Sequence, residues 1–452
     1  MLYLTRYCIS TITRNGITKF LPIKQNLYTY TPKSAVTNST LTLIRRNVIL
    51  HKDLLKNGGI IAKGFSTKSA EKSNKTVGKW LLTCSGMVFV AVVLGGITRL
   101  TESGLSMVTW KLLGEKMPTT EIQWHAEFER YKQFPEYKIN NQNMTLEEFK
   151  RIWWMEYLHR MWGRLIGAVF IIPATYFWTK GMLTPGMKIR VAVLGSLIGL
   201  QGLMGWYMVK SGLEDRFVEP SDVPRVSQYR LAAHLGMAFI IYTGFLYNAL
   251  DYLVPAQKLN LDHSNVDISN LKSKLKRFRM LVHSTKGLVF FTALSGAFVA
   301  GMDAGLIYNT FPKMANKWIP DDVFTLSPLL KNFTENPTTV QFDHRILVCF
   351  GHNSQINIRY YKFSLFLQGI TTLSLITYIA IASRKYKLPG NAKKAIVAVL
   401  CAGYLQVLLG ISTLVHHVPL PLAASHQSGS LIVLSTMIWL THELKYLKYV
   451  LK

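Results

Sequence analysis

The sequence predicts an all-α polytopic membrane protein in which eight transmembrane helices form two pseudo-symmetric four-helix bundles. The first observation is composition: 49% of the 452 residues are hydrophobic and only 17% are charged, which is typical of membrane-embedded chains. The second is that apolar runs of about 20 residues, the length that crosses a bilayer, recur along the sequence. The third is that four motifs of the first half recur in the same order in the second half, which indicates a duplication.

The N-terminal arm, residues 1–70, holds eleven Lys or Arg residues but only one acid, Asp53, and is rich in Ser and Thr. This composition predicts a mitochondrial transit peptide, and a disordered basic tail on a bacterial-type protein is the alternative. The net charge of +28 lies largely in this arm and in loops that flank apolar runs. We therefore expect the lipid bilayer as a partner and no nucleic acid.

The expected spans divide into two sets of four. An N-terminal half at residues 78–252 and a C-terminal half at residues 280–445 are joined by a basic linker at 253–279. Seven runs are clear and an eighth, 363–382, lies in a disturbed region. The seven are residues 80–98, 153–178, 189–209, 231–250, 281–302, 395–415 and 422–440.

Basic loops give the expected orientation, because Lys and Arg mark the side of the membrane that is not crossed. They follow the second and fourth spans and precede the seventh, so with eight spans they share one side. In a mitochondrial inner membrane both termini would then lie in the matrix and the 101–150 loop in the intermembrane space.

The duplication is visible in four pairs of motifs. A His-Arg motif at residues 156–160 recurs at 341–345. The other pairs are residues 96–105 with 297–306, 201–205 with 406–410, and 232–236 with 424–429.

Histidines occupy equivalent positions in the two halves. The second and fourth spans contribute His159 and His234 in the first half, and His344 and His426 in the second. Each lies a turn or two inside the same end of its helix, so the members of a pair share a depth. Two imidazoles that face each other across a bundle are suitable axial ligands for haem iron. Two haem sites are predicted. A single histidine here could equally be interfacial, but four unpaired buried imidazoles would be costly.

Glu156 lies three residues before His159 and on the same helical face, whereas the second half has neutral Gln341 at this position. A carboxylate beside a haem in a low dielectric could accept a proton, stabilise a cation or position water. The first half is therefore the expected reaction site and the second an electron-relaying one. Alternatively, Glu156 could simply bind Arg160.

Three arginines near the predicted haem sites are candidate partners of haem propionates, because a guanidinium fork suits a carboxylate. They could equally be lipid-facing anchors. These residues are Arg160, Arg164 and Arg345.

The chain resembles the haem A synthase family, mitochondrial type, over residues 78–445. The resemblance is carried by long strings at residues 95–106, 156–164, 201–206, 208–213 and 303–305. It implies an inner-membrane enzyme that oxidises the C8 methyl of haem O to the formyl group of haem A, for cytochrome c oxidase assembly. Two successive hydroxylations would give a geminal diol, which loses water.

By resemblance, His159 and His234 would hold the substrate haem O, and Glu156 would be the essential acid. His344 and His426 would ligate a haem b cofactor. A matrix ferredoxin with its reductase would supply electrons, and the farnesyltransferase that makes haem O is a candidate partner. A homo-oligomer is expected as well. The cysteine pair that bacterial relatives carry in external loops has no counterpart in residues 101–150.

A polar stretch interrupts the sixth span soon after His344. About nine apolar residues before this break cannot cross a bilayer, whereas joining Val348 directly to about Gly369 restores an ordinary span. We therefore hypothesise an insertion at about residues 349–368, such as retained intron sequence. Two other functions use the same histidines: a bis-histidine di-haem cytochrome that relays electrons, and a haem carrier or assembly scaffold.

Overall fold

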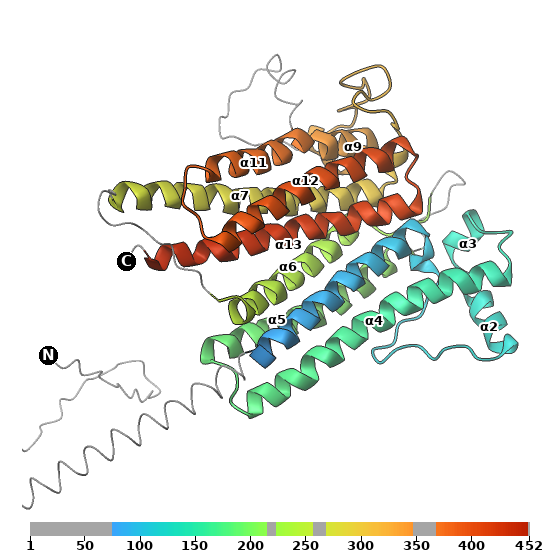
Figure 1. Ribbon diagram of the computed structural model, residues 1–452. Coiled ribbons are helices and arrows are strands. Elements are labelled where there is room, and N and C mark those ends of the chain that lie inside the picture. The colour runs from blue at the N-terminus through green and yellow to red at the C-terminus, as the bar shows by residue number, and fades with distance from the viewer. Residues whose placement is uncertain (1–74, 215–222, 256–267, 347–367, 451–452) are drawn as a thin grey trace, which may run out of the picture. The chain divides into compact units, whose positions relative to one another are not determined.

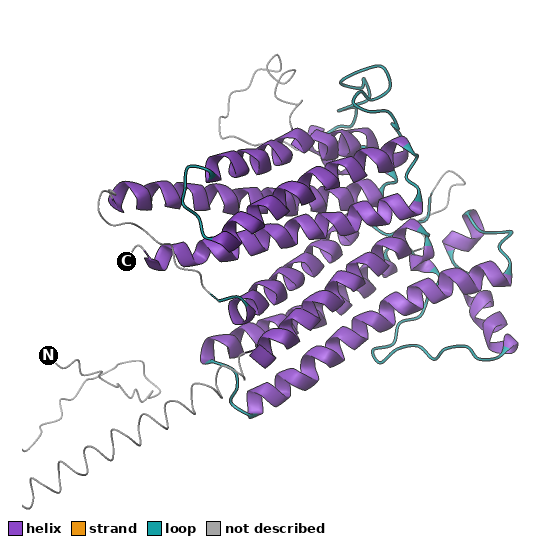
Figure 2. Ribbon diagram, viewed as in Figure 1, coloured by secondary structure: helices purple, strands orange, loops and turns teal. Residues whose placement is uncertain are grey.

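The computed structural model describes residues 75–214, 223–255, 268–346 and 368–450, and within these ranges every long regular element is a helix (Figure 2). The predicted transit peptide, residues 1–70, and residues 349–367 of the proposed insertion lie outside the described residues. In the first half the elements are the first helix Lys75–Leu100, η1 Ser103–Leu105, α2 Glu121–Tyr131, α3 Pro135–Ile139, α4 Leu146–Thr179, α5 Pro185–Lys210 and α6 Gln228–Leu253.

The second half repeats this order. Its elements are α7 Ile268–Gly301, η2 Ala304–Leu306, η3 Leu329–Lys331, α8 Asn332–Glu335, α9 Pro337–Ile346, α11 Gln368–Ser383, α12 Gly390–Val415 and α13 Leu420–Val450. The two halves form neighbouring groups of helices that meet along α6, α7 and α13 (Figure 1).

Six of the described helices are long and apolar enough to cross a membrane: the first helix, α4, α5, α6, α7 and α12. The 31-residue α13 packs along α12 and α7. The predicted sixth span is present as two pieces, α9 and the apolar α11, which contact each other and α7. The all-α polytopic fold class is confirmed.

Two short 3₁₀ helices show the pseudo-symmetry at the level of the backbone. Glu102 precedes η1 with φ 52°, and Asp303 precedes η2 with φ 51°. A non-glycine residue in the left-handed region is uncommon, so its recurrence at equivalent positions reflects the same chain turn made twice.

The linker predicted at residues 253–279 is too long, because α7 already begins at Ile268. Its basic side chains are good helix formers, and Leu275, Phe278 and Val282 are buried along one helical face. Phe278 packs on Tyr386 with ring centroids 5.1 Å apart. This segment forms a helix despite its polar composition, because its apolar residues recur at helical spacing.

The second span begins earlier than its apolar run, because α4 has a capping box. Thr145 Oγ1 accepts a hydrogen bond from the backbone of Glu148, and the Glu148 carboxylate accepts one from the Thr145 N–H at 2.8 Å. This reciprocal pairing satisfies the free N–H groups of the first turn. The helix therefore extends beyond the apolar run, into a segment against which α2 packs.

The two halves are joined by polar contacts. Gln427 of α13 donates a 2.9 Å hydrogen bond to the backbone oxygen of Val92 in the first helix. Its side-chain amide occupies the space that a Cβ on Gly96 would fill. At the same end of the helices, Asp303 accepts a hydrogen bond from Arg99 at 2.8 Å.

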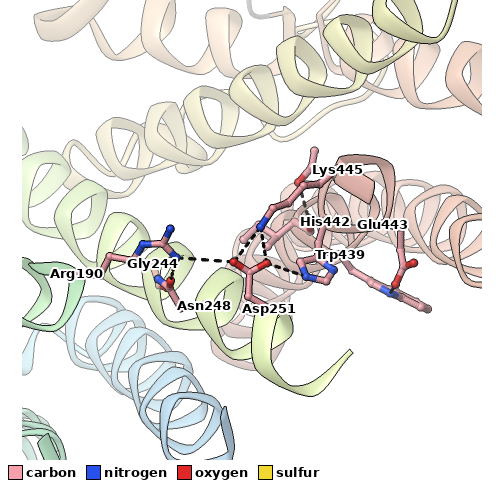
Figure 3. Close-up of polar contacts among 10 residues, drawn as sticks. Arg190, Gly244, Asn248, Asp251, Trp439, His442, Glu443 and Lys445 are labelled. Carbon is pink, nitrogen blue, oxygen red and sulfur yellow. Dashed lines mark hydrogen bonds and ion pairs between the residues drawn. The ribbon is translucent and has the colours of Figure 1, made fainter. Parts of the chain in front are cut away.

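At the other end of the helices, Asp251 of α6 binds two residues of α13 (Figure 3). Lys445 Nζ lies 2.7 and 2.9 Å from its two carboxylate oxygens, and His442 Nε2 lies 3.1 Å from Oδ1. Arg190 of α5 donates a 2.7 Å hydrogen bond to Asn248, one turn before Asp251. A carboxylate that contacts two basic side chains fixes α6 against α13.

We expect Asp251→Asn to lower the thermal stability of the detergent-solubilised protein, because it removes the charge that Lys445 and His442 contact. Losing hydrogen bonds to a charged group costs about 1–3 kcal/mol. The matched control is Asp321→Asn, since the Asp321 side chain is 81% exposed and contacts the nearby Lys317. Equal melting temperatures for the two variants would show that this contact does not hold the halves together.

Candidate functional site

The first pair of predicted ligands, His159 of α4 and His234 of α6, is half-buried and interacts electrostatically. Among the described residues, the Nδ1 atom of neither imidazole has a hydrogen-bond partner, although both atoms are buried. Gln201 of α5 donates a 3.0 Å hydrogen bond to the backbone oxygen of His234. Imidazoles with a buried, unpaired nitrogen fit a site that is completed by a ligand.

The second pair, His344 of α9 and His426 of α13, is in direct ring contact. Their ring centroids lie 6.3 Å apart and the ring planes are nearly perpendicular, at 88°. With metal–nitrogen bonds of about 2 Å and about 1.1 Å from nitrogen to ring centroid, two imidazoles on one metal have centroids about 6 Å apart. The observed spacing therefore fits two ligands of one iron.

Glu156 is buried on the histidine face of α4, with 3% of its surface exposed. Its Oε1 accepts a hydrogen bond from Arg160 Nε. The other two nitrogens of Arg160 donate to the backbone oxygens of Thr109 and Met107, at 2.8 and 2.9 Å. The alternative expected from the sequence, that Glu156 binds Arg160, is thus observed, and the same arginine also closes the loop after η1 over the site.

The second half repeats this arrangement without the charge. Gln341 is buried and donates a 3.0 Å hydrogen bond to the backbone oxygen of Tyr308. Arg345 donates to the same oxygen at 2.6 Å and to that of Thr310 at 2.9 Å. At equivalent positions beside an arginine, the first half therefore has a carboxylate and the second half an amide.

All three predicted propionate-binding arginines contact loop backbone. Arg164 Nε donates a 3.0 Å hydrogen bond to the backbone oxygen of Leu112, in addition to the contacts of Arg160 and Arg345. Each arginine thus links a helix that bears a histidine to the loop beside it.

An aromatic cluster packs α2 against the first turns of α4, next to Glu156 in the chain. Trp153, one helical turn before Glu156, stacks on Tyr157 with ring centroids 4.9 Å apart. Trp124 of α2 meets the edge of Trp153 at 5.0 Å. Phe149 stacks on Phe128 of the same α2 at 4.9 Å. The loop between the first and second spans is therefore a folded cap.

Sequence analysis missed a buried carboxyl in this cap, Glu136, which is 5% exposed. Tyr131 donates a 2.9 Å hydrogen bond to its Oε2, and Asn141 donates to the Tyr131 oxygen at 2.8 Å. Burial raises the pKa of Glu136 to about 8, despite the hydrogen bond from Tyr131, and Glu156 contributes to its electrostatic environment. Nothing in the loop sequence marks this residue, because its burial depends on how α2 and α3 fold.

The arrangement agrees with comparisons to known proteins. A family model described as cytochrome oxidase assembly protein, COX15-CtaA, matches residues 78–351 and 366–438. The chain belongs to this family. It is 54% identical to heme A synthase COX15 of Homo sapiens over 384 residues, which cover 85% of this chain and 86% of that protein. The corresponding protein of Arabidopsis thaliana is 44% identical over 374 residues, 83% of this chain and 76% of its own length.

Bacterial relatives are similar as well. Heme A synthase of Nitrosospira multiformis is 43% identical over 372 residues, which cover 82% of this chain and 94% of that protein. The region of similarity in this COX15-CtaA member therefore includes both histidine pairs and Glu156.

We expect Glu136→Gln to remove a pH dependence from the stability of the cap. Unfolded Glu136 ionises near pH 4.5 and the folded residue near pH 8, so the wild-type protein loses stability as pH rises through this window. Glutamine stays neutral and can still accept the Tyr131 hydrogen bond. As the pH rises from about 5 to about 8, the melting temperature of the variant should increase relative to that of the wild type. A difference in melting temperature between the two proteins that does not change with pH would contradict the burial of an uncharged carboxyl.

Proposed function

We propose that the chain is a haem A synthase, which oxidises the C8 methyl of haem O to the formyl group of haem A for cytochrome c oxidase. The observation that carries this proposal is a buried carboxylate, Glu156, beside only one of two equivalent histidine pairs. Similarity to heme A synthases over more than four fifths of the chain supports it.

His159 and His234 are the proposed ligands of the substrate haem O. Their half-buried rings and unpaired Nδ1 atoms fit such a role. His344 and His426 are the proposed ligands of a haem b cofactor, and the 6.3 Å separation of their rings supports this assignment. When bound, haem b supplies one-electron transfer. Arg160, Arg164 and Arg345 remain the proposed partners of propionates.

Glu156 is the proposed catalytic residue. Each hydroxylation is a two-electron oxidation that replaces a C–H bond of the C8 methyl with a C–OH bond, and it requires an oxygen atom and an electron acceptor from outside the chain. The resulting geminal diol loses water to leave the aldehyde. Arg160 Nε donates a hydrogen bond to Oε1 of Glu156. Oε2 is then the oxygen that can accept a proton from a hydroxyl group of the substrate or from water. Glu156 is 3% exposed, so its carboxylate is shielded from bulk water.

The proposed setting is the mitochondrial inner membrane, with residues 1–70 as the transit peptide and both termini in the matrix. The basic loops that flank the spans support this orientation. A matrix ferredoxin with its reductase is the proposed electron donor, the farnesyltransferase that makes haem O is a proposed partner, and the chain is proposed to form a homo-oligomer.

The insertion at about residues 349–368 also remains a proposal. The match to the family model is interrupted between residues 351 and 366, which supports it. So does the adjacency of α9 and α11, which together occupy one span position.

We expect Glu156→Gln to retain haem while losing haem A formation by about 100-fold or more, because a proton-accepting group contributes about this much. Haem extraction and chromatography from the purified protein give both quantities. Glu147→Gln is the control, since Glu147 lies on the same helix but is 73% exposed. Unchanged haem A formation in the Glu156 variant would refute the catalytic role.

The same extraction separates the alternatives. Haem B together with haem O or haem A supports two sites of different function. Haem B alone would favour a relay cytochrome. A protein that carries haem O but does not convert it when reduced ferredoxin is supplied would favour a carrier or scaffold.

We expect mass spectrometry of the mature protein to recover a peptide that joins Val348 directly to a residue near Gly369. Such a peptide would restore an uninterrupted apolar span. Sequencing the transcript tests the same point independently. An intact peptide through residues 349–368 would overturn the insertion hypothesis.

A further inference from the structure

Each of the four histidines lies against a glycine of the preceding long helix. A Cβ atom built on Gly95 would lie 2.9 Å from Cε1 of His159, and one on Gly205 would lie 3.0 Å from Cε1 of His234. In the second half, a Cβ on Gly296 would lie 3.2 Å from Cε1 of His344, and one on Gly410 would lie 2.7 Å from Cε1 of His426.

The contact has the same geometry in all four places, because Cε1 is the nearest ring atom each time. The glycines are also equivalent in the repeat: Gly95 corresponds to Gly296, and Gly205 to Gly410. Other glycines of these helices behave differently. A Cβ on Gly86, Gly199 or Gly287 would meet nothing within 4 Å. Contact with an imidazole is therefore not a general property of glycines in this fold.

The distances are all shorter than the usual separation of about 3.5–4.0 Å between packed carbon atoms. An alanine at Gly95 or Gly410 would force the imidazole to move, and one at Gly205 or Gly296 would require it to shift by a few tenths of an ångström. A free histidine could turn to make room. A histidine bound to a metal cannot, because the metal–nitrogen bond of about 2 Å fixes its position. Each glycine also destabilises its helix relative to alanine.

We propose that Gly95, Gly205, Gly296 and Gly410 are positioning residues that seat the imidazoles for axial coordination of haem iron. We call these four glycines the imidazole seats. The inference rests on the proposed function, because it requires the four histidines to be ligands. It adds which backbone positions fix the ligands.

In α5 and α12 the seat belongs to a larger unit. Gln201 and Gln406 lie four residues before Gly205 and Gly410, and therefore on the same helical face. Their amides donate hydrogen bonds to the backbone oxygens of His234, at 3.0 Å, and His426, at 2.8 Å. The glutamine thus holds the backbone of the histidine, and the glycine lets the imidazole ring pack closely against the neighbouring helix.

The other polar contacts of the rings differ between the halves. Ser295, beside the seat Gly296, has its Oγ 2.8 Å from Nδ1 of His344. The equivalent residue beside Gly95 is Leu94, which has no polar side chain. The glycine contact recurs at all four histidines, whereas the contact with Ser295 is specific to His344.

The test compares Gly95→Ala and Gly296→Ala with Gly86→Ala and Gly287→Ala. The controls are on the same two helices, nine residues earlier, at positions where a Cβ meets open space. All four substitutions raise helix propensity equally, so differences report the space at the site. The readouts are haem content per protein, the low-spin electron paramagnetic resonance signal and the reduction potential of each haem.

We expect Gly296→Ala to weaken haem b binding about tenfold or more, the usual scale for losing support of a metal ligand, or to shift its low-spin signal and potential. Gly95→Ala should do the same to haem O alone. Circular dichroism checks that the helices form, and the haem-to-protein ratio remains valid if less protein accumulates.

Variants of the histidines themselves separate failure of this inference from failure of the proposed function. If His159→Ala and His344→Ala lose their haems while the seat variants match their controls, the seats are refuted and the ligand assignment stands. If the histidine variants keep both haems unchanged, the ligand assignment fails and the seats fail with it.

Discussion

The structure depends on one constraint: inside a bilayer, a polar side chain must find its partner within the protein. The four histidines, Glu156 and the arginines all lie near one end of the spans, and each has a specific neighbour there. Arg160 and Arg345 satisfy the constraint in the same way, by donating to loop carbonyls after η1 and η2. These contacts fix the loops over the histidine pairs. The site and its cover are therefore specified by the same side chains.

Within this shared framework, one substitution distinguishes the halves. Glu156 and Gln341 are both buried and both contact the arginine four residues later. The amide needs no counter-charge, whereas the carboxylate is balanced by Arg160. The first half thus buries a paired glutamate and arginine, which is costly to form, where the second half buries an amide. The two halves thus offer similar settings, and of the two residues only Glu156 is a carboxylate.

The sequence predicted the elements that depend on composition and repetition. Long apolar runs gave the spans, and the equivalent positions of His159, His234, His344 and His426 gave two pairs. Two of the imidazole seats, Gly205 and Gly410, were present in a repeated motif, but the contacts of the seats depend on distances between helices that no spacing reveals. The burial of Glu136 was not predicted for a similar reason, since a charged loop residue is ordinarily exposed. The early start of α7 was missed because its basic composition concealed a buried face.

The contact between Gln427 and the first helix has a consequence for how the two halves can change. Gln427 follows His426 directly, and it fills the space above Gly96, which follows the seat of His159. Each half thus contributes to this contact the residue directly next to its own site. A substitution at residue 96 or 427 acts on both sites at once. Because Gln427 fills the space at Gly96, neither residue can change size without displacing the other, and this contact couples the two halves.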